Sequence, residues 1–380
     1  VAAGLTLFCG YYFVYWLAID SFGLFALAAM AVFLAGARLA AAPSLAAAVR
    51  WGVVLGVAAG LAHLARADGP LLPAATLLAL APQLRRQPAA RPLAGLAAAA
   101  AGYLLVMGPW FARNLAVSGS PLPSGGLATV FLTEYNEIFS YQQPLDLAHY
   151  LADGWGPVLA GKAAALARNL GVLFGLEYWL IPFAALGAWR WRGWLPMRAA
   201  LVYGVLLYLA MSLVFTFPSG RGSMLHSGVA LVPWLAMAAV EGVQVAVVWV
   251  AARLPHWNPP VAYRNFSIIF LLLSAAMCAY LTGEQARDWE KQVAGYRALL
   301  PLLPQPGATL MTLNPPGWWY VARTPSIHLP GAGTRPRQGL GGLRPAGGRA
   351  PLSAGGRRRR LAAAAGQSVG HCHLQPRGAG

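Results

Sequence analysis

Three arginines and one histidine lie where apolar runs of the chain begin or end. Arg66 belongs to the sequence GLAHLARADG, Arg113 follows the sequence PWFA, and Arg221 stands between two glycines shortly before His226. A guanidinium can form two parallel hydrogen bonds to a phosphate, and glycines allow the backbone to approach such a group closely. We therefore predict that these four side chains bind a phosphate at the level of lipid headgroups. A purely structural hydrogen bond or ion pair is the alternative for each of them.

Three polar residues are candidates for supporting roles. Asp68 is expected to fix the turn after Arg66 or to hold the Arg66 side chain, and Asn114 is expected to cap the turn after Arg113. Asp20 precedes an apolar run, where it is either a helix N-cap or a catalytic acid. No Walker A, nucleophile-elbow, HExxH or paired CxxC motif is present, and the three cysteines have no metal-ligand spacing, so no metal site is predicted.

The composition indicates the environment of these residues. Hydrophobic residues make up 58% of the chain and charged residues 10%, whereas a typical soluble domain has about 25% charged residues. Apolar runs of about 20 residues, long enough to cross a bilayer, recur along the chain. The predicted fold class is an all-α polytopic membrane protein. About nine spans are expected, at 2–18, 21–37, 51–66, 70–84, 93–112, 171–189, 199–217, 225–250 and 265–283.

Charge orients the predicted spans. Arginines without acidic residues occupy four alternate loops, which contain Arg38 and Arg50, then Arg85, Arg86 and Arg91, then Arg190, Arg192 and Arg198, and finally Arg253 and Arg264. The positive-inside rule assigns these loops to the cytoplasm. The candidate phosphate-binding residues and nearly all acids then lie on the other side. We expect a multi-pass protein of the plasma membrane with an extracytoplasmic working face. Nine of the 28 basic residues behind the net charge of +17 lie after Gly331. Most of the remaining excess lies in these short loops and is a topological signal, so nucleic acid is not an expected partner.

The chain is expected to have three parts. Residues 1–283 are predicted to be the transmembrane domain, with an outer loop at 114–170. The helical spacing of apolar residues in 144–170 is typical of helices that lie on a membrane surface. Glu134 and Glu137 of this loop could bind a cation or accept a proton, and a solvated pair is the alternative.

The two later parts differ in character. Residues 284–330 are predicted to form an amphipathic helix, a strand, a turn at Asn314–Gly317 and a second strand, the beginning of a small extracytoplasmic α/β domain. Residues 331–380 are a low-complexity tail rich in Arg, Gly and Pro. The tail is either a disordered basic arm or, as we favour, the product of a shifted reading frame, because the strand-turn-strand unit before it is unfinished.

Taken together, these stretches resemble bacterial GT-C class integral-membrane glycosyltransferases, in particular the protein O-mannosyltransferase-like group that includes the aminoarabinose transferase of lipid A. The matching stretches are Asp20-Ser21-Phe22, Gly60–Gly69, Pro109-Trp110 with Arg113-Asn114, and Met224–Ser227. The segment NPPGWWYVARTPSIHLP is similar to the start of the periplasmic domain of some members. The resemblance covers about residues 1–330.

The resemblance implies transfer of a sugar from a polyprenyl-phosphate donor to a lipid, glycan or protein acceptor, with the arginines offsetting the charge of the leaving phosphate. It names no cofactor besides this donor and leaves a divalent metal open. Members of the class carry the catalytic acid in the first large outer loop. The present chain begins at Val1 inside an apolar run, so we expect an N-terminally truncated, inactive chain without that acid. A transporter or flippase of an anionic lipid or solute is the alternative function, and a non-catalytic membrane scaffold is a third.

Overall fold

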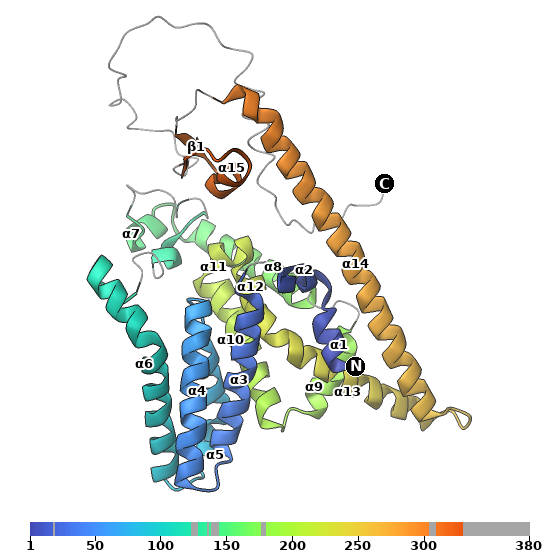
Figure 1. Ribbon diagram of the computed structural model, residues 1–380. Coiled ribbons are helices and arrows are strands. Elements are labelled where there is room, and N and C mark those ends of the chain that lie inside the picture. The colour runs from blue at the N-terminus through green and yellow to red at the C-terminus, as the bar shows by residue number, and fades with distance from the viewer. Residues whose placement is uncertain are drawn as a thin grey trace, which may run out of the picture. The chain divides into compact units, whose positions relative to one another are not determined.

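The computed structural model describes most of the chain in two compact units (Figure 1). The first unit comprises Val1–Tyr135 and Leu145–Thr282, and the second comprises Asn136–Pro144 and Gly283–Gly380. The described residues are 1–17, 20–122, 128–134, 137, 144–175, 180–303 and 309–329, without the side chains of Tyr11, Leu17, Phe174 and Arg221. The predicted tail at 331–380 therefore lies outside the described residues.

Six helices of the described chain are long and apolar enough to cross a membrane. They are Phe22–Ala40 (α3), Leu45–Ala65 (α4), Ala90–Ser118 (α6), Leu195–Val214 (α10 with the π-helical segment η4), Met224–Ala251 (α12, η6 and α13) and Pro259–Leu302 (α14 with η7). The apolar helix α5 (Leu71–Leu84) is shorter. The chain is thus largely helical with six candidate membrane spans, in agreement with the predicted polytopic class.

The structure departs most from the expected spans at three of the nine. The run 2–18 is broken into α1 (Ala2–Leu7), η1 (Gly10–Tyr12) and α2 (Phe13–Leu17). Phe8 and Cys9 have ψ angles of 60° and 41°, and Gly10 has a φ of +60°, so the backbone leaves the α-helical conformation at these three residues. Helix α8 (Trp155–Gly175) ends within the expected span 171–189, and α9 (Ile181–Arg190) begins later. Helix α14 (Pro259–Leu299) includes the expected span 265–283. Without a break, it continues into the amphipathic helix that was expected after this span.

Helices α3 to α6 run alternately up and down, joined by short turns (Figure 1). Ser44 caps α4, because its Oγ accepts a hydrogen bond from the Ala47 N–H at 3.2 Å. Helix α6 continues through Pro109 and ends at Gly119, whose φ of +70° is typical of a helix C-terminus. The prediction that Arg113 and Asn114 follow the end of this helix is therefore wrong, and both residues lie in its last turns.

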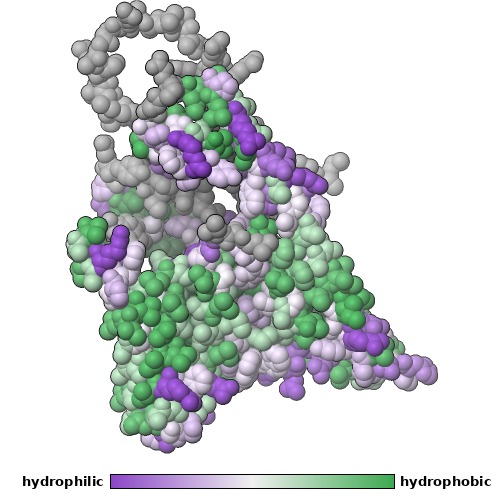
Figure 2. All heavy atoms as spheres, in the orientation of Figure 1, coloured by the Kyte–Doolittle hydropathy of each residue, from purple (hydrophilic) through white to green (hydrophobic). Residues whose placement is uncertain are grey.

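Glycines bring α4 and α6 into close contact. Gly52, Gly56 and Gly60 are spaced four residues apart on one face of α4, and a Cβ atom on Gly56 would lie 1.9 Å from the carbonyl oxygen of Ala99 on α6. Small residues at such spacing allow helix backbones to approach each other. The outward faces are apolar, as expected for contact with lipid, and Leu105 of α6 is 74% exposed. Figure 2 shows this hydrophobic flank in green.

The predicted outer loop contains three helical segments among its described residues. They are η2 (Ala128–Phe131), α7 (Leu147–Tyr150) and α8 (Trp155–Gly175). The prediction of helices within 144–170 is confirmed, and their position on a membrane surface stays a prediction. Helices α11 (Thr216–Pro218) and α12 (Met224–Gly228), with the π-helical segment η5 (Ser219–Ser223) between them, connect η4 (Ala210–Val214) to η6 (Val229–Leu231) and α13 (Val232–Ala251).

The second unit contains a β-α-β arrangement. Strands β1 (Leu310–Thr312) and β2 (Ser326–His328) pair in parallel, and α15 (Pro315–Ala322) connects them. The predicted turn at Asn314–Gly317 is instead the start of α15: the Asn314 side chain accepts a hydrogen bond from the Gly317 N–H at 3.2 Å, and prolines occupy the first helical positions. A larger α/β domain around this arrangement stays a prediction.

Candidate functional site

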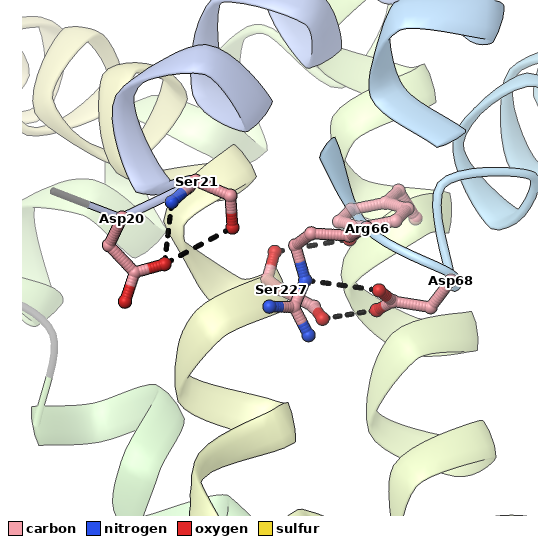
Figure 3. Close-up of polar contacts among 6 residues, drawn as sticks. Asp20, Ser21, Arg66, Asp68 and Ser227 are labelled. Carbon is pink, nitrogen blue, oxygen red and sulfur yellow. Dashed lines mark hydrogen bonds and ion pairs between the residues drawn. The ribbon is translucent and has the colours of Figure 1, made fainter. Parts of the chain in front are cut away.

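Arg66 and Asp68 form an ion pair at the end of α4 (Figure 3). Arg66 is the C-cap residue of α4, and Asp68 lies in the turn that leads to α5. The Arg66 Nε donates to Asp68 Oδ1 at 3.0 Å, and the two side chains are 15% and 18% exposed. The other carboxylate oxygen of Asp68 accepts a hydrogen bond from the Ser227 hydroxyl of α12. Asp68 was expected either to fix the turn after Arg66 or to hold the Arg66 side chain, and it holds the side chain. It also links the α4–α5 turn to α12.

The first turns of α3 connect Arg66 to His226. The Arg66 guanidinium lies 5.7 Å from the ring centroid of Phe25, which favours the cation electrostatically. One helical turn earlier, the Phe22 ring packs against the His226 imidazole with centroids 4.3 Å apart. We call Arg66, Asp68, His226 and Ser227 the Arg66 cluster.

Two buried tyrosines fix the segment that carries His226. The Tyr12 hydroxyl donates to the carbonyl oxygen of Leu225 at 2.5 Å, and the Tyr203 hydroxyl donates to that of Ser227 at 3.1 Å. Both tyrosines are 0% exposed. Sequence reasoning missed them because each stands in an apolar run. A buried tyrosine hydroxyl needs a partner, but the sequence does not indicate which distant carbonyl supplies it.

The segment before His226 is helical rather than an open turn. Residues 219–223 form a π-helical turn in which Gly222 has a φ of +109°. A Cβ atom on Gly222 would lie 3.3 Å from the Cδ2 atom of His226, so this position combines a backbone conformation that suits glycine with close packing. The backbone of Arg221 belongs to the same turn, but its side chain lies outside the described residues. Its predicted phosphate contact stays a prediction.

Helix α8 satisfies the polar groups of the irregular stretch between α10 and α12. Lys162 donates to the carbonyl of Leu213, and Arg168 Nη2 donates to that of Thr216 at 3.3 Å. A π-helical turn and short helices leave such carbonyls without their usual helical donors. The fully buried Asn169 adds hydrogen bonds of 3.1 and 3.2 Å to the hydroxyls of two serines, Ser212 and Ser219. Sequence analysis expected α8 only as a surface helix and missed this role.

Asp20 lies at the start of α3, apart from the ion pair in Figure 3. It is exposed, and its Oδ1 accepts hydrogen bonds from the backbone N–H of Ser21 at 2.5 Å and from the Ser21 hydroxyl at 3.3 Å. The N-cap residue of α3 is Ser21, so the prediction of Asp20 as N-cap is wrong by one position. Within the described chain, no hydrogen bond or ion pair joins Asp20 to the Arg66 cluster.

Arg113 and Asn114 contact each other and the end of α6. Arg113 is exposed, lies 5.1 Å from the Trp110 ring centroid and donates from Nη1 to Asn114 Oδ1 at 3.3 Å. Asn114 is buried and donates to the carbonyl of Pro121 at 3.1 Å, which fastens the chain as it leaves the helix. Among the described residues, no such contact connects Arg113 with the Arg66 cluster.

A histidine-tyrosine pair that sequence analysis missed lies between α4 and α6. His63 Nδ1 and the Tyr103 hydroxyl are 2.6 Å apart, and Phe111 packs against both rings. His63 precedes Arg66 by less than one helical turn. The pair therefore joins the end of α4, close to Arg66, to the middle of α6.

Acidic and metal-binding groups are few. Glu137 is only 8% exposed, so the interpretation of Glu134 and Glu137 as a solvated pair is wrong for Glu137. Within the described residues, no group of three or more His, Cys, Asp or Glu side chains could hold a metal ion.

No family model, curated protein or solved structure matches this chain.

Proposed function

We propose that this chain is the membrane-embedded part of a glycosyltransferase that takes its sugar from a polyprenyl-phosphate carrier at the extracytoplasmic face of the plasma membrane. The Arg66 cluster is the observation that carries the proposal. The Arg66 guanidinium, at the end of α4, and the His226 imidazole of α12 pack against Phe25 and Phe22 of the first turns of α3. Asp68 holds Arg66, and two tyrosines hold the segment that carries His226. The residues also belong to the stretches that resemble the GT-C class.

The chemistry of Arg66 suits a phosphate. Of the N–H groups of Arg66, only the Nε–H donates a hydrogen bond to Asp68. Among the described residues, neither Nη group of Arg66 has a hydrogen-bond acceptor. These two groups can donate to phosphate oxygens, and His226 can act as a second donor. In the proposed reaction, the bond between the anomeric carbon and the phosphate oxygen breaks while the acceptor oxygen bonds to that carbon. The donors then offset the negative charge that develops on the leaving phosphate.

The acceptor must lose its proton in this reaction, and we assign no base. Asp20 is exposed near the start of α3, but its carboxylate already accepts two hydrogen bonds from Ser21. It stays a candidate for this role. Arg113 and Arg221 stay candidates for contacts to the donor phosphate.

Sugar transfer by membranes that contain the protein tests the proposal. The donors are radiolabelled polyprenyl-phosphate hexoses and pentoses, and the readout is label in lipid, glycan or protein. We expect Arg66→Ala to lower transfer about a hundredfold or more, because it removes a charged donor from the leaving group. Arg297→Ala, which removes an exposed arginine of α14, is the matched control and should transfer normally. Equal transfer by both variants would contradict the proposal.

A transporter or flippase of an anionic lipid is the second candidate. Glu241 favours it, because this half-buried acid lies in the interior of the candidate span Met224–Ala251, and ionisable residues within spans often mark transport pathways. Transbilayer movement of a labelled carrier lipid in proteoliposomes, without sugar transfer and sensitive to Glu241→Gln, would favour this function over the enzyme.

A further inference from the structure

We infer that the end of the helical bundle opposite the Arg66 cluster binds the headgroups of anionic phospholipids. Three loops form this end, between α3 and α4, between α5 and α6, and between α9 and α10. These loops and the adjoining turns of the helices contain no acidic residue. They contain eight arginines: Arg38, Arg50, Arg85, Arg86, Arg91, Arg190, Arg192 and Arg198. We call the three loops, together with these adjoining helix turns, the arginine end. The inference does not depend on the proposed enzymatic function.

Hydrogen bonds hold the three loops together. Gln87, between α5 and α6, donates from Nε2 to the carbonyls of Leu39 at 3.3 Å and Ala40 at 2.5 Å, at the end of α3. Arg198 in the first turn of α10 donates from Nη2 to the side-chain oxygen of Gln83, near the end of α5. The arginines therefore share one end of the first unit, where their positive potentials add.

Within the described part of the chain, no acidic side chain neutralises the charges of the arginine end. Six of its arginines are exposed, namely Arg38, Arg50, Arg85, Arg86, Arg190 and Arg192. The ion pairs between described residues are those of Arg66, Arg287 and Lys291, and none involves this end. The inaccessible Nε–H of Arg198 also has no acceptor within the described chain. A surface of this kind attracts anions.

Tryptophans indicate that the anions lie at a bilayer surface. The guanidinium carbons of Arg38 and Arg50 lie 5.8 and 5.5 Å from the ring centroid of Trp51, and that of Arg192 lies 4.2 Å from Trp189, which is 69% exposed. Tryptophan and arginine together are typical of the headgroup level of a membrane. Figure 2 shows hydrophilic residues at the lower edge of the first unit, below its hydrophobic flank.

This combination favours a lipid over a soluble polyanion. Anionic phospholipids present their phosphates beside an apolar phase, and the bundle offers guanidinium groups beside exposed tryptophan and apolar side chains. Electrostatic attraction of this kind grows with each arginine near the surface and is screened by salt. The partner to which we commit is therefore an anionic glycerophospholipid in the leaflet that surrounds the arginine end.

Thermal unfolding of the purified full chain in a neutral detergent tests the inference. Phosphatidylglycerol is expected to raise the unfolding midpoint, whereas phosphatidylcholine and soluble glycerol 3-phosphate are not. Because the attraction is electrostatic, about 0.5 M NaCl should remove most of the rise. Equal effects of the two lipids, or an equal effect of glycerol 3-phosphate, would overturn the inference.

A triple variant locates the site. Arg85→Gln, Arg86→Gln and Arg192→Gln together change three exposed arginines, so the fold should persist, and the apparent affinity for phosphatidylglycerol should fall about a hundredfold. Arg297→Gln is the matched control and should bind normally. The basic segment after residue 331 is present in all these proteins, so an unchanged affinity of the triple variant would contradict binding at the arginine end. If the triple variant does not fold, the lipid comparison on the unaltered chain still decides.

Discussion

At the scale of single residues, Asp68 is the connection on which the Arg66 cluster depends. Its two carboxylate oxygens accept hydrogen bonds from Arg66, two positions before it, and from Ser227, a residue of a different span. The pairing with Arg66 could be predicted from the sequence, because both residues stand in one short turn. The contacts with Ser227, Phe25 and the tyrosines could not, because they join segments that only tertiary packing brings together.

Replacing Asp68 by Ala should therefore remove two interactions of the Arg66 cluster. Arg66 loses its ion-pair partner, and the Ser227 hydroxyl loses its hydrogen-bond acceptor. We expect the free energy of unfolding to fall by about 3 kcal/mol, the usual cost of breaking a largely buried ion pair. Denaturant unfolding in detergent measures it, and a double-mutant cycle with Arg66→Ala isolates the coupling. The exposed pair Glu284–Arg287 is the control: Glu284→Ala should cost less than about 0.5 kcal/mol. Equal costs at the two sites would contradict the account.

At the scale of elements, the helices were predictable and several of their ends were not. Apolar runs of suitable length predict spans, but the break of 2–18 depends on the backbone conformation of residues 8–10. Helix α6 runs through Pro109 to Ser118, with Gly119 as its C-cap. The sequence signal at Asn314 was available, since asparagine followed by two prolines suits a helix start. The short strand patterns on either side favoured the prediction of a turn instead.

The contact between α4 and α6 should tolerate no side chain at its centre. Gly56→Ala would place a methyl group 1.9 Å from the Ala99 carbonyl oxygen, so α4 and α6 must separate, and we expect a loss of about 1–3 kcal/mol. Gly108→Ala, on α6 itself, meets no atom within 4 Å and should be neutral or stabilise the helix by up to about 1 kcal/mol. Thermal unfolding of both variants checks the difference. A Gly56→Ala protein as stable as Gly108→Ala would show that the helices are not packed this closely.

At the scale of the whole molecule, composition was sufficient to predict a helical membrane protein, because that class depends on averages over the chain. The number of spans depends on local backbone geometry and could not be predicted in the same way. Orientation rests on the distribution of arginines, which the positive-inside rule converts into a topology.

Labelling of introduced cysteines tests that topology. Ala67 lies beside the Arg66 cluster and Ala41 at the arginine end, and both are exposed. In a Cys372→Ser background, where the remaining cysteines Cys9 and Cys278 are buried, Ala67→Cys should react with a membrane-impermeant maleimide in intact cells. Ala41→Cys should react only after the cells are permeabilised. The reverse pattern would place the Arg66 cluster in the cytoplasm.

The most direct test of the central claim is binding of a short-chain polyprenyl phosphate to the purified protein, compared with the corresponding polyprenol. We predict that the phosphate binds at least tenfold more tightly than the alcohol, because Arg66 and His226 recognise the charged group. Arg66→Ala should abolish this preference, whereas Arg297→Ala should keep it. Equal affinities for the two ligands, or an unchanged preference in Arg66→Ala, would contradict the assignment of the Arg66 cluster as a phosphate site.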